Sequence, residues 1–278
     1  MGASSLAEHL LRAVMGPPAR YFRRFVSDRN YRKFEVFHGR YRGFPRFQEV
    51  QIFLDGYDLL IPDMLSFLHS WKEIFVEEIY ACSLPENPRI LDLGANIGLS
   101  ILFHKRHFPN AKIVAFEADP VIFAYLKRNL AVNNADREVT LINKAVWDKD
   151  EILTFWSEGA DGGRIQTGSA DGQVKQIEAV DVASALAGQE FDFIKMDIEG
   201  AEARVLPRCN EFLKHAHAVF VEYHSRPGTP QHLAKVCQLL GDAGFRVYVT
   251  PVYCNPKPFD RVVVENGYDL QLNLFAIR

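Results

Sequence analysis

Six ionisable side chains stand where apolar segments of the sequence end. They are Asp92, Glu117, Asp197, Glu199, Glu222 and His224. A parallel sheet places its ligands beyond the carboxyl ends of its strands, so a sheet built from these segments would gather the six groups around one ligand. Carboxylates and an imidazole in one place can remove a proton from an acceptor, or hold a divalent cation through their oxygen atoms.

The segment Arg89–Gly98, which reads RILDLGANIG, combines a strand, an acid and a turn. Its apolar run predicts a buried parallel strand, and Asp92 stands at the end of that strand. Gly94 and Gly98 let the backbone turn sharply and approach a ligand closely. The apolar residues 99–103 then predict a helix. A strand, a glycine turn and a helix start, in this order, form a binding site for a nucleotide-type ligand.

The glycine turn fits S-adenosylmethionine (SAM) better than a nicotinamide dinucleotide. Counted from Gly94, the dinucleotide fingerprint requires two further glycines where this chain has Asn96 and Leu99. Those glycines allow a pyrophosphate to lie against the turn. An acid beside the turn repels phosphate and suits the sulfonium and ammonium of SAM. The residues expected to contact the cofactor here are Asp92, Gly94, Ala95, Asn96 and Gly98.

A second predicted strand, Lys112–Phe116, is followed by Glu117, which lies 23 residues after Gly94. An acid at an offset of about 20 residues can accept hydrogen bonds from ribose hydroxyls. Asp119 and Pro120 come next, as an N-cap residue and a first helical residue. The strand–helix–strand unit is therefore complete, and we expect Glu117 to hold the ribose of the cofactor.

Four motifs in order resemble the FkbM-type family of SAM-dependent methyltransferases. They are DLGANIG at 92–98, FEADP at 116–120, NKAV at 143–146 and MDIEGAE at 196–202, and their order and spacing agree with the family across residues 72–250. One departure is Ala118, where we would expect a proline; that position mainly shapes the turn.

The resemblance implies a fold, a reaction and further contacts. The implied fold is a class I methyltransferase-like, doubly wound (Rossmann-like) α/β sheet of about seven strands. The implied reaction is O-methylation of a sugar or polyketide-type hydroxyl, with S-adenosylhomocysteine as the other product. The adenine of SAM would then lie beside Ala145 and Val146.

Methyl transfer from SAM is an in-line displacement at carbon, and a hydroxyl acceptor must also lose its proton to a positioned base. Asp197, Glu199 and His224 are the catalytic candidates. His224 has an unperturbed pKa of about 6.5, which suits a base near neutral pH. We therefore hypothesise that His224 removes the proton while Asp197 orients the acceptor or the imidazole.

Metal assistance is the alternative to a protein base. A divalent cation held by Asp197, Glu199 and Glu222 would lower the pKa of the acceptor hydroxyl. We predict no dedicated metal site, so this alternative ranks second.

The acceptor is a small molecule or a glycan in this interpretation. Residues 158–164, which read EGADGGR, form a small, polar and glycine-rich loop. Such a loop is either a plain hairpin turn or a mobile lid over the acceptor. Asp161, Gly162 and Glu222 are the residues that we expect to contact the acceptor.

The rest of the chain predicts the elements that position these residues. With 278 residues, 48% of them hydrophobic, the chain can bury a full core in one α/β domain with an extension. Residues 1–70 are expected to form an N-terminal cap, with a hairpin turn at Asp55–Gly56, and residues 71–278 the methyltransferase domain. A helix is expected at 64–80, and further strands are expected at 139–142, 151–156, 174–180, 191–196, 218–221, 245–249 and 270–277.

The charge of the chain is unevenly spread. A net charge of −3 excludes a generally basic nucleic-acid-binding protein. Residues 1–50 hold ten Lys and Arg against four Asp and Glu, a charge of +6, which leaves −9 for the rest. We expect the basic amphipathic segment 5–26, which Gly16-Pro17-Pro18 should interrupt, to dock against the domain. The less favoured alternative is peripheral contact with an anionic membrane or an anionic acceptor.

The location of the protein follows from what the sequence lacks. No apolar run approaches the roughly 20 residues of a membrane span, and the first residues do not have the pattern of a signal peptide. Four cysteines without paired spacing indicate reduced thiols. We therefore expect a cytoplasmic protein, and make no prediction of its oligomeric state.

Two other classes of function remain open. One is a nicotinamide-dependent oxidoreductase on a similar sheet, which the missing glycines disfavour. The other is a SAM-binding protein without catalysis, because binding motifs do not prove turnover.

Overall fold

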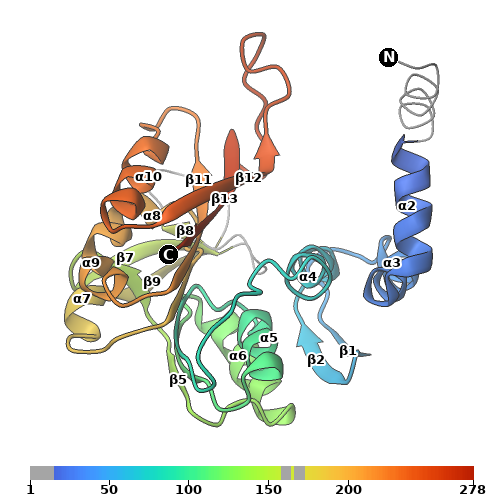
Figure 1. The fold of residues 1–278 in the computed structure, drawn as a ribbon, viewed down its shortest axis with the longest axis horizontal. Helices are drawn as coiled ribbons and strands as arrows, with labels where there is room; N and C mark the ends of the chain where they lie inside the picture. The colour runs from blue at the N-terminus through green and yellow to red at the C-terminus, as the bar shows by residue number, and fades with distance from the viewer. Residues whose placement is uncertain (1–15, 158–163, 166–172) are drawn as a thin grey trace, which may run out of the picture.

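A seven-stranded mixed sheet forms the centre of the computed structural model, which describes residues 16–157, 164–165 and 173–278 (Figure 1). In spatial order its strands are β12 (Arg246–Cys254), β13 (Leu270–Ile277), β11 (Ala218–Ser225), β10 (Phe193–Met196), β3 (Arg89–Leu93), β4 (Lys112–Phe116) and β5 (Val139–Ile142). Strand β13 runs antiparallel to both of its neighbours, and the other pairs are parallel. The predicted doubly wound α/β sheet is confirmed.

The chain winds outward in both directions from β3. Strands β4 and β5 follow on one side, and β10 and β11 lie on the other. Such a reversal creates a crevice beyond the carboxyl ends of the two central strands. The register pairs Asp92 with Lys195 and Leu93 with Met196, so β3 and β10 end at the same level of the sheet. The two following turns therefore face each other.

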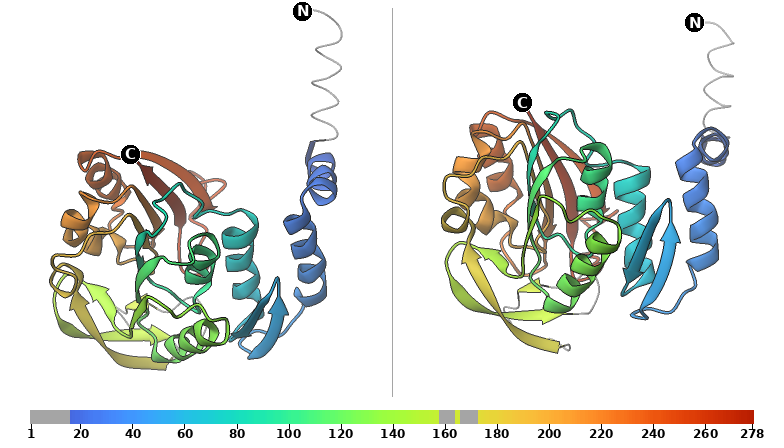
Figure 2. Two further views of the ribbon diagram at one scale, coloured as in Figure 1. Left: turned by 60° about the horizontal axis from the view of Figure 1, so that its bottom comes forward. Right: turned by 90° about the horizontal axis from the view of Figure 1, so that it is seen from below.

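Helices cover both faces of the sheet (Figure 2). One face carries α7 (Val182–Ala185), α8 (Glu202–Val205), the 3₁₀ turn η2 (Leu206–Cys209), α9 (Asn210–Leu213) and α10 (Leu233–Asp242). The other face carries α4 (Met64–Trp71), α5 (Leu99–His107) and α6 (Pro120–Val132). Each face has its own cluster of buried apolar side chains, so the sheet separates two cores.

A second sheet of four strands extends the first of these cores. Its order is β6 (Ala145–Trp147), β9 (Gln173–Asp181), β7 (Glu151–Ser157) and β8 (Arg164–Ile165). Leu153, Phe155 and Ile177 of this sheet are buried in the core beneath α8 to α10. Asp161 and Gly162, two predicted acceptor contacts, lie outside the described residues.

The N-terminal elements pack outside α4. They are α2 (Gly16–Ser27), α3 (Arg29–Tyr41) and the antiparallel hairpin of β1 (Val50–Leu54) and β2 (Tyr57–Ile61). The hairpin turn falls at Asp55–Gly56 as predicted, and both residues have positive φ. Helix α2 begins at Gly16, so Pro17 and Pro18 stand in its first turn, where proline is tolerated.

The N-terminal elements share their core with the sheet. Phe34, Leu59 and Trp71 belong to the same buried cluster as Phe103 on α5. The boundary predicted after residue 70 falls inside α4, and the division into cap and domain stays a prediction.

A buried amide ties the hairpin to the glycine turn. Asn129 on α6 accepts a hydrogen bond from the N–H of Leu60 at 2.9 Å, and its amide nitrogen donates to the carbonyl oxygens of Leu60 and Ile97. The turn after β3 is therefore supported from outside the sheet.

Strand β11 is longer than predicted. The sequence suggested an end at Val221, but β13 pairs with β11 as far as Ser225, including Glu222 with Asn273 and His224 with Gln271. Glu222 and His224 are thus strand residues on one face of the sheet, and not part of a loop beyond it. The following helix, α10, begins at Leu233. In the part of the chain that the structure describes, no helix is both long and apolar enough to cross a bilayer.

Two glycines with the same backbone conformation give a test of the crevice. Gly94 has φ +91° and Gly56 has φ +95°, but an added Cβ would overlap the carbonyl oxygen of Asp197 only at Gly94. We expect Gly56→Ala to lower the free energy of unfolding by about 1–2 kcal/mol, the strain of the left-handed conformation. Gly94→Ala should cost about 1–3 kcal/mol more, through overpacking. Equal losses in urea unfolding would show that β3 and β10 do not approach this closely.

Candidate active site

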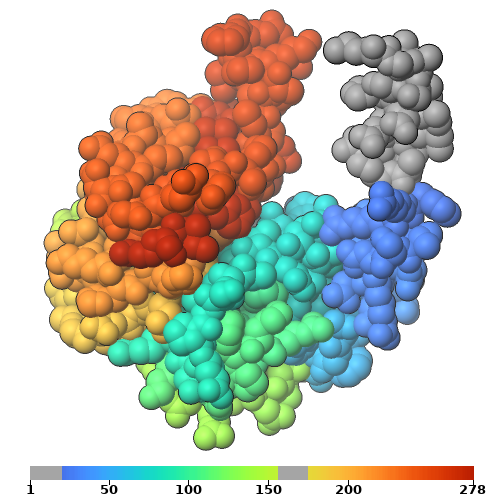
Figure 3. Space-filling view, in the orientation of Figure 1, coloured from blue at the N-terminus to red at the C-terminus, as the bar shows by residue number. Residues whose placement is uncertain are grey.

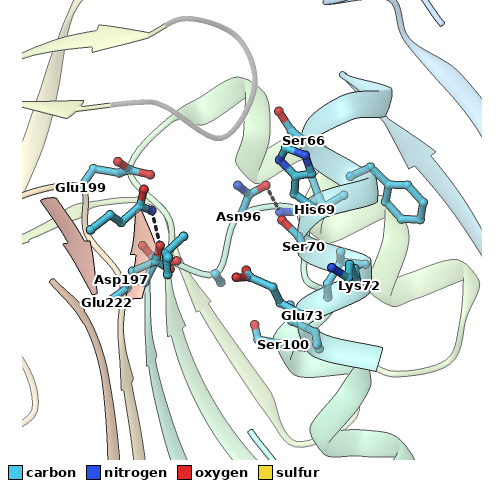
Figure 4. Close-up of a pocket in the computed structure, with 18 of the residues that line it drawn as sticks. Ser66, His69, Ser70, Lys72, Glu73, Asn96, Ser100, Asp197, Glu199 and Glu222 are labelled. Carbon is cyan, nitrogen blue, oxygen red and sulfur yellow. Dashed lines mark hydrogen bonds between the residues drawn. The ribbon is translucent and has the colours of Figure 1, made fainter. Parts of the chain in front are cut away.

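A cavity of about 370 Å³ lies beyond the carboxyl ends of β3, β10 and β11 (Figure 4). Helix α4 and the π-helical turn η1 (Lys72–Val76) form the opposite wall. The turn residues Gly94–Ile97 form the floor between them, and the end of β12 and the start of β13 add Tyr253 and Gln271. The cavity is therefore at the crevice that the winding of the sheet predicts.

The wall of the cavity is predominantly acidic. Its carboxylates are Asp63, Glu73, Asp197, Glu199, Glu222 and Glu265, and its ammonium groups are Lys72 and Lys195. Lys195 is already paired with carboxylates, as described next. The surplus of negative charge favours a cationic ligand and disfavours a pyrophosphate.

Lys195 on β10 connects the two central strands. Its side chain is 4% exposed, and its Nζ lies 3.5 Å from Asp92 Oδ1 and 3.3 Å from Asp197 Oδ2. The ammonium also donates to the carbonyl oxygen of Gly94. Burial alone would lower the pKa of Lys195, but Asp197 and Asp92 raise that pKa above its usual value. The group therefore stays charged and holds the crevice together.

Sequence analysis did not single out Lys195. The signal was present, because a lysine interrupts the apolar run directly before Met196 and Asp197. Lysine is almost never fully buried unless it is paired, so its place inside a predicted central strand implied a buried acid beside it.

The structure separates the predicted cofactor residues of the glycine turn into two groups. Gly94, Ala95 and Asn96 line the cavity. Asp92 lies beneath the turn, 1% exposed, and accepts a hydrogen bond from Ser100 Oγ at 2.5 Å. Gly98 packs against α6, where an added Cβ would lie 2.8 Å from Leu126 Cδ1. Asp92 and Gly98 therefore shape the turn from behind.

Glu117 lies beside the glycine turn at the end of β4. Its two carboxylate oxygens accept hydrogen bonds from the N–H groups of Asn96 and Asp119, at 2.9 and 2.8 Å. Burial raises the pKa of Glu117 to about 7, against the lowering effect of these two hydrogen bonds. Each oxygen keeps a second lone pair that can accept a hydrogen bond from a ligand hydroxyl.

Ala145 and Val146 are buried on β6, with 5% and 4% of their surface exposed. Their side chains belong to the core between the two sheets and are not part of the cavity wall. Any contact with an adenine must therefore use their backbone. Asn143 connects this region to Glu117, because its side-chain amide donates to the Glu117 carbonyl oxygen at 2.8 Å.

His224 lies behind the cavity wall. Its side chain is 1% exposed, and its Nδ1 is 3.0 Å from Glu202 Oε1. Its Nε2 is 3.7 Å from Glu199 Oε2 and 3.8 Å from Glu222 Oε1. Burial lowers the pKa of His224, but the surrounding carboxylates, Glu199 foremost, raise it well above its usual value. The imidazole is not part of the cavity lining, and a raised pKa favours its protonated form, which cannot accept a proton. Both observations disfavour His224 as the base and favour a supporting role.

Glu202 was not a candidate in the sequence analysis, although it belongs to the motif at 196–202. It is 1% exposed at the start of α8 and also accepts a hydrogen bond from the N–H of Gly200 at 2.9 Å. Glu202 thus fixes both the imidazole of His224 and the turn that carries Glu199.

Two carboxylates of the wall are held by hydrogen bonds. Tyr268 Oη donates to Glu199 Oε2 at 2.5 Å, and the amide of Gln271 donates to Glu222 Oε1. Burial and the charge of Asp197 raise the pKa of Glu222 well above its usual value. Figure 4 shows Asp197, Glu199 and Glu222 together on the strand side of the cavity.

Asp197, Glu199 and His224 also have the spacing of metal ligands. One ligand atom from each lies within 4.8 Å of the other two. His224 thus takes the place that the sequence-based alternative gave to Glu222. A cation here would need a neutral His224, whose Nε2 already lies 3.3 Å from the amide nitrogen of Gln271. Metal assistance stays second to a protein base.

Glu73 on η1 faces these groups across the cavity. Figure 4 shows its carboxylate directed toward the strand ends, near Ser100. Burial, together with the negative charge of Asp197, raises the pKa of Glu73 to about 7. Sequence analysis did not propose Glu73, because it looked like a polar position on an amphipathic helix.

Comparison with known families gives one match over more than half of the chain. A family model described as "Methyltransferase FkbM domain" matches residues 92–247. Methyltransferase sdnD of Sordaria araneosa is 54% identical over 66 residues, which are 23% of this chain and 26% of that protein. Methyltransferase 1 of Beauveria bassiana is 28% identical over 166 residues, 51% of this chain and 66% of that protein. The matches thus span less than two thirds of each relative.

Two solved methyltransferase structures are similar to this chain at low sequence identity. A methyltransferase FkbM from Methylobacillus flagellatus has a TM-score of 0.46 and 14% identity, over 70% of this chain and 45% of that one. A SAM-dependent methyltransferase from Agrobacterium tumefaciens has a TM-score of 0.49 and 10% identity, over 84% and 72%.

Removal of the Lys195 ammonium should leave buried carboxylates uncompensated. We expect Lys195→Met to lower the free energy of unfolding by about 3–5 kcal/mol, as when one partner of a buried ion pair is removed. The double variant with Asp92→Asn should recover part of this loss, because it removes one stranded charge. Urea unfolding measures both.

The loss of unfolding free energy in Lys195→Met should also depend on pH. A stranded, buried carboxylate has a higher pKa in the folded than in the unfolded state, so protonation stabilises the folded variant as the pH falls. The difference in unfolding free energy between the variant and the wild type should therefore shrink as the pH is lowered from 8 to 5. A difference that stays constant, with no recovery in the double variant, would contradict a central role for Lys195.

Proposed function

The chain belongs to the FkbM methyltransferase family, and we propose that it transfers the methyl group of SAM to a hydroxyl of a sugar or another small-molecule or glycan acceptor. The observation that carries this proposal is the acidic cavity at the crevice of the sheet, directly beside the glycine turn and Glu117. A cationic donor fits such a cavity, and a hydroxyl acceptor can enter it from the side of α4.

The proposed position of the donor follows from the site. The ribose hydroxyls donate to Glu117, and the adenine lies toward the backbone of Ala145 and Val146. The methionine end passes over Gly94 into the cavity, where the sulfonium is near Asp197. This orientation places the cation of SAM where the negative charge is concentrated.

The reaction is an in-line displacement. The acceptor oxygen forms a bond to the methyl carbon while the bond from that carbon to sulfur breaks, and S-adenosylhomocysteine leaves as a neutral thioether. The hydroxyl proton goes to a base. Holding donor and acceptor in line in a closed cavity supplies most of the acceleration such a reaction needs.

The α4 wall supports a polyhydroxylated acceptor. His69 and Ser70 line the cavity opposite the strand ends and offer hydrogen-bonding groups for hydroxyls. Glu222, a predicted acceptor contact, also lines the cavity, but Gln271 holds its carboxylate. Its role is therefore to shape the acceptor side.

The basic N-terminal segment serves to dock α2 and α3 in this proposal. Arg24 forms a two-pronged ion pair with Glu77, both contacts at 2.8 Å. Lys33 pairs with Asp55 on the hairpin, at 2.6 Å. Basic side chains that face acids of the same chain are not available to a membrane, so docking remains the favoured interpretation. A cytoplasmic location stays a prediction.

The acceptor is tested by product analysis. The protein is incubated with SAM and a panel of sugars, glycosides and polyketide-type alcohols, and products are searched by mass spectrometry for the mass of one added methylene. Methylated product from an alcohol supports the proposal. Binding of SAM with no product from any acceptor would favour a SAM-binding protein without catalysis, and tight binding of NAD instead would favour an oxidoreductase.

Glu117 provides the test of the donor. Glu117→Gln keeps the shape of the side chain but removes its charge, so it should weaken S-adenosylhomocysteine binding by about 1.5–3 kcal/mol, the worth of hydrogen bonds to a charged group. Because the ionised carboxylate binds the ribose best, wild-type affinity should rise as the pH rises through about 7. Calorimetry at pH 6, 7 and 8 measures both effects. Unchanged affinity in the folded variant would remove Glu117 from the ribose site.

A further inference from the structure

Transfer of a methyl group to a hydroxyl requires a base, and on the basis of the proposed function we propose that this base is Glu73. Its carboxylate lines the cavity on the side opposite Asp197 and Glu222. An acceptor hydroxyl between the two walls can therefore face the donor methyl group and Glu73 at the same time.

The backbone that carries Glu73 is unusual. Helix α4 passes into η1, where the N–H of Glu77 donates to the carbonyl oxygen of Lys72 at 2.8 Å, one residue further back than in an α-helix. Trp71 and Phe75 remain stacked in the core, with ring centroids 4.1 Å apart. Single π-helical turns of this kind occur frequently at functional sites. The wide turn presents Glu73 to the cavity while Trp71, Ile74 and Phe75 stay buried.

The other candidates are each held by a partner. Lys195 neutralises Asp197 at 3.3 Å, and Tyr268 holds Glu199 at 2.5 Å. Gln271 donates to Glu222, and His224 lies behind the wall with its Nδ1 3.0 Å from Glu202 Oε1. These partners occupy one lone pair of each carboxylate and fix its orientation, whereas a base needs a lone pair that is free to turn toward the acceptor.

Glu73 differs from these groups. Among the residues that the structure describes, none forms a hydrogen bond or ion pair with its carboxylate. An ionisable group that is largely removed from water without such a partner points to a functional role.

The charges around Glu73 suit a base that is activated by the donor. The charged and titratable groups near it are Asp197 and Glu222 on the strand side, Tyr80, which also lines the cavity, and Lys72 and Glu77 on its own segment. Burial and Asp197 hold the pKa of Glu73 at about 7, within the range of an efficient base at neutral pH. The sulfonium of SAM should lower this pKa and so ionise Glu73 when the donor binds.

In the proposed methyl transfer, Glu73 takes the hydroxyl proton and the acceptor oxygen bonds to the methyl carbon. The electron pair of the broken carbon–sulfur bond stays on sulfur. Glu73 is left protonated and S-adenosylhomocysteine is neutral. Loss of the proton to solvent and exchange of the product for SAM restore the starting state.

The first experiment needs no acceptor. Calorimetry measures the affinities of SAM and S-adenosylhomocysteine between pH 5.5 and 8.5, and only SAM has the sulfonium that attracts an ionised Glu73. The ratio of the two affinities should rise in favour of SAM as the pH rises through about 7. Glu73→Gln should remove this rise. The matched control Glu78→Gln, a conservative change at an exposed glutamate nearby, should keep it.

The second experiment uses the best acceptor from the product panel. Glu73→Gln should lower kcat by about 10²–10⁴-fold, with the affinity for S-adenosylhomocysteine nearly unchanged, because removal of a general base acts on the rate. The wild-type rate should rise with pH through about 7, because the base must be ionised, and this limb should be absent from the variant.

The outcomes separate the two proposals. If the wild type binds neither SAM nor S-adenosylhomocysteine, the proposed function fails and the base with it. If both ligands bind but their affinity ratio has the same pH dependence in Glu73→Gln, Glu73 does not face the sulfonium and only the base assignment is overturned. A kcat of Glu73→Gln equal to that of the wild type also overturns the assignment of Glu73 as the base.

Discussion

The site depends on one buried ammonium group. Lys195 connects Asp92 of β3, the carbonyl oxygen of Gly94 in the turn and Asp197 beyond β10. Charges buried this deeply are costly unless each has well-placed partners, so the lysine and the carboxylates require one another. The backbone ladder holds β3 beside β10 as far as Leu93 and Met196, and the lysine contacts continue this connection into the two turns that follow. The position of the glycine turn, and of the cavity above it, depends on these contacts.

A second ionic contact supports the far side of the cavity in the same way. His224 and Glu202 are both 1% exposed and lie behind Glu199 and Glu222. Lys195, which is 4% exposed, supports Asp197 from the same side. The cavity lining keeps more carboxylates than ammonium groups. An acidic cavity whose carboxylates are held by buried partners is the arrangement we expect for a cationic donor, because the charges are in place before the ligand arrives.

The surface view adds the surroundings of the cavity (Figure 3). The connection between β12 and β13 projects from the body of the molecule, and α2 stands apart from it on the side of α4. Tyr253 and Gln271, at the base of this connection, line the cavity, so the projecting segment borders the acceptor side.

The sequence predicted the features that depend on local patterns. The glycine turn, the acid after β4 and the alternation of strands and helices depend on neighbouring residues, and the structure has the sheet that they imply. The length of β11 was not predictable in this way, because Glu222 and His224 join the strand only through pairing with β13, about 50 residues later.

The roles of single groups were harder to predict. His224 was proposed as a base from its ordinary pKa, but its pKa depends on carboxylates that the fold brings around it. Glu73 was not singled out for the converse reason: a polar residue in a helix is usually solvated, and only the packing of η1 in the fold removes most of this side chain from water. Lys195 alone left a signal in the sequence, as a charge inside a predicted central strand.

The most direct measurement is a crystal structure of the protein with bound SAM. We predict that the ribose hydroxyls lie within hydrogen-bond distance of the Glu117 carboxylate and that the sulfonium lies in the cavity between Glu73 and Asp197. Density that places the ribose away from Glu117, or the methionine end outside the cavity, would contradict this assignment of the site.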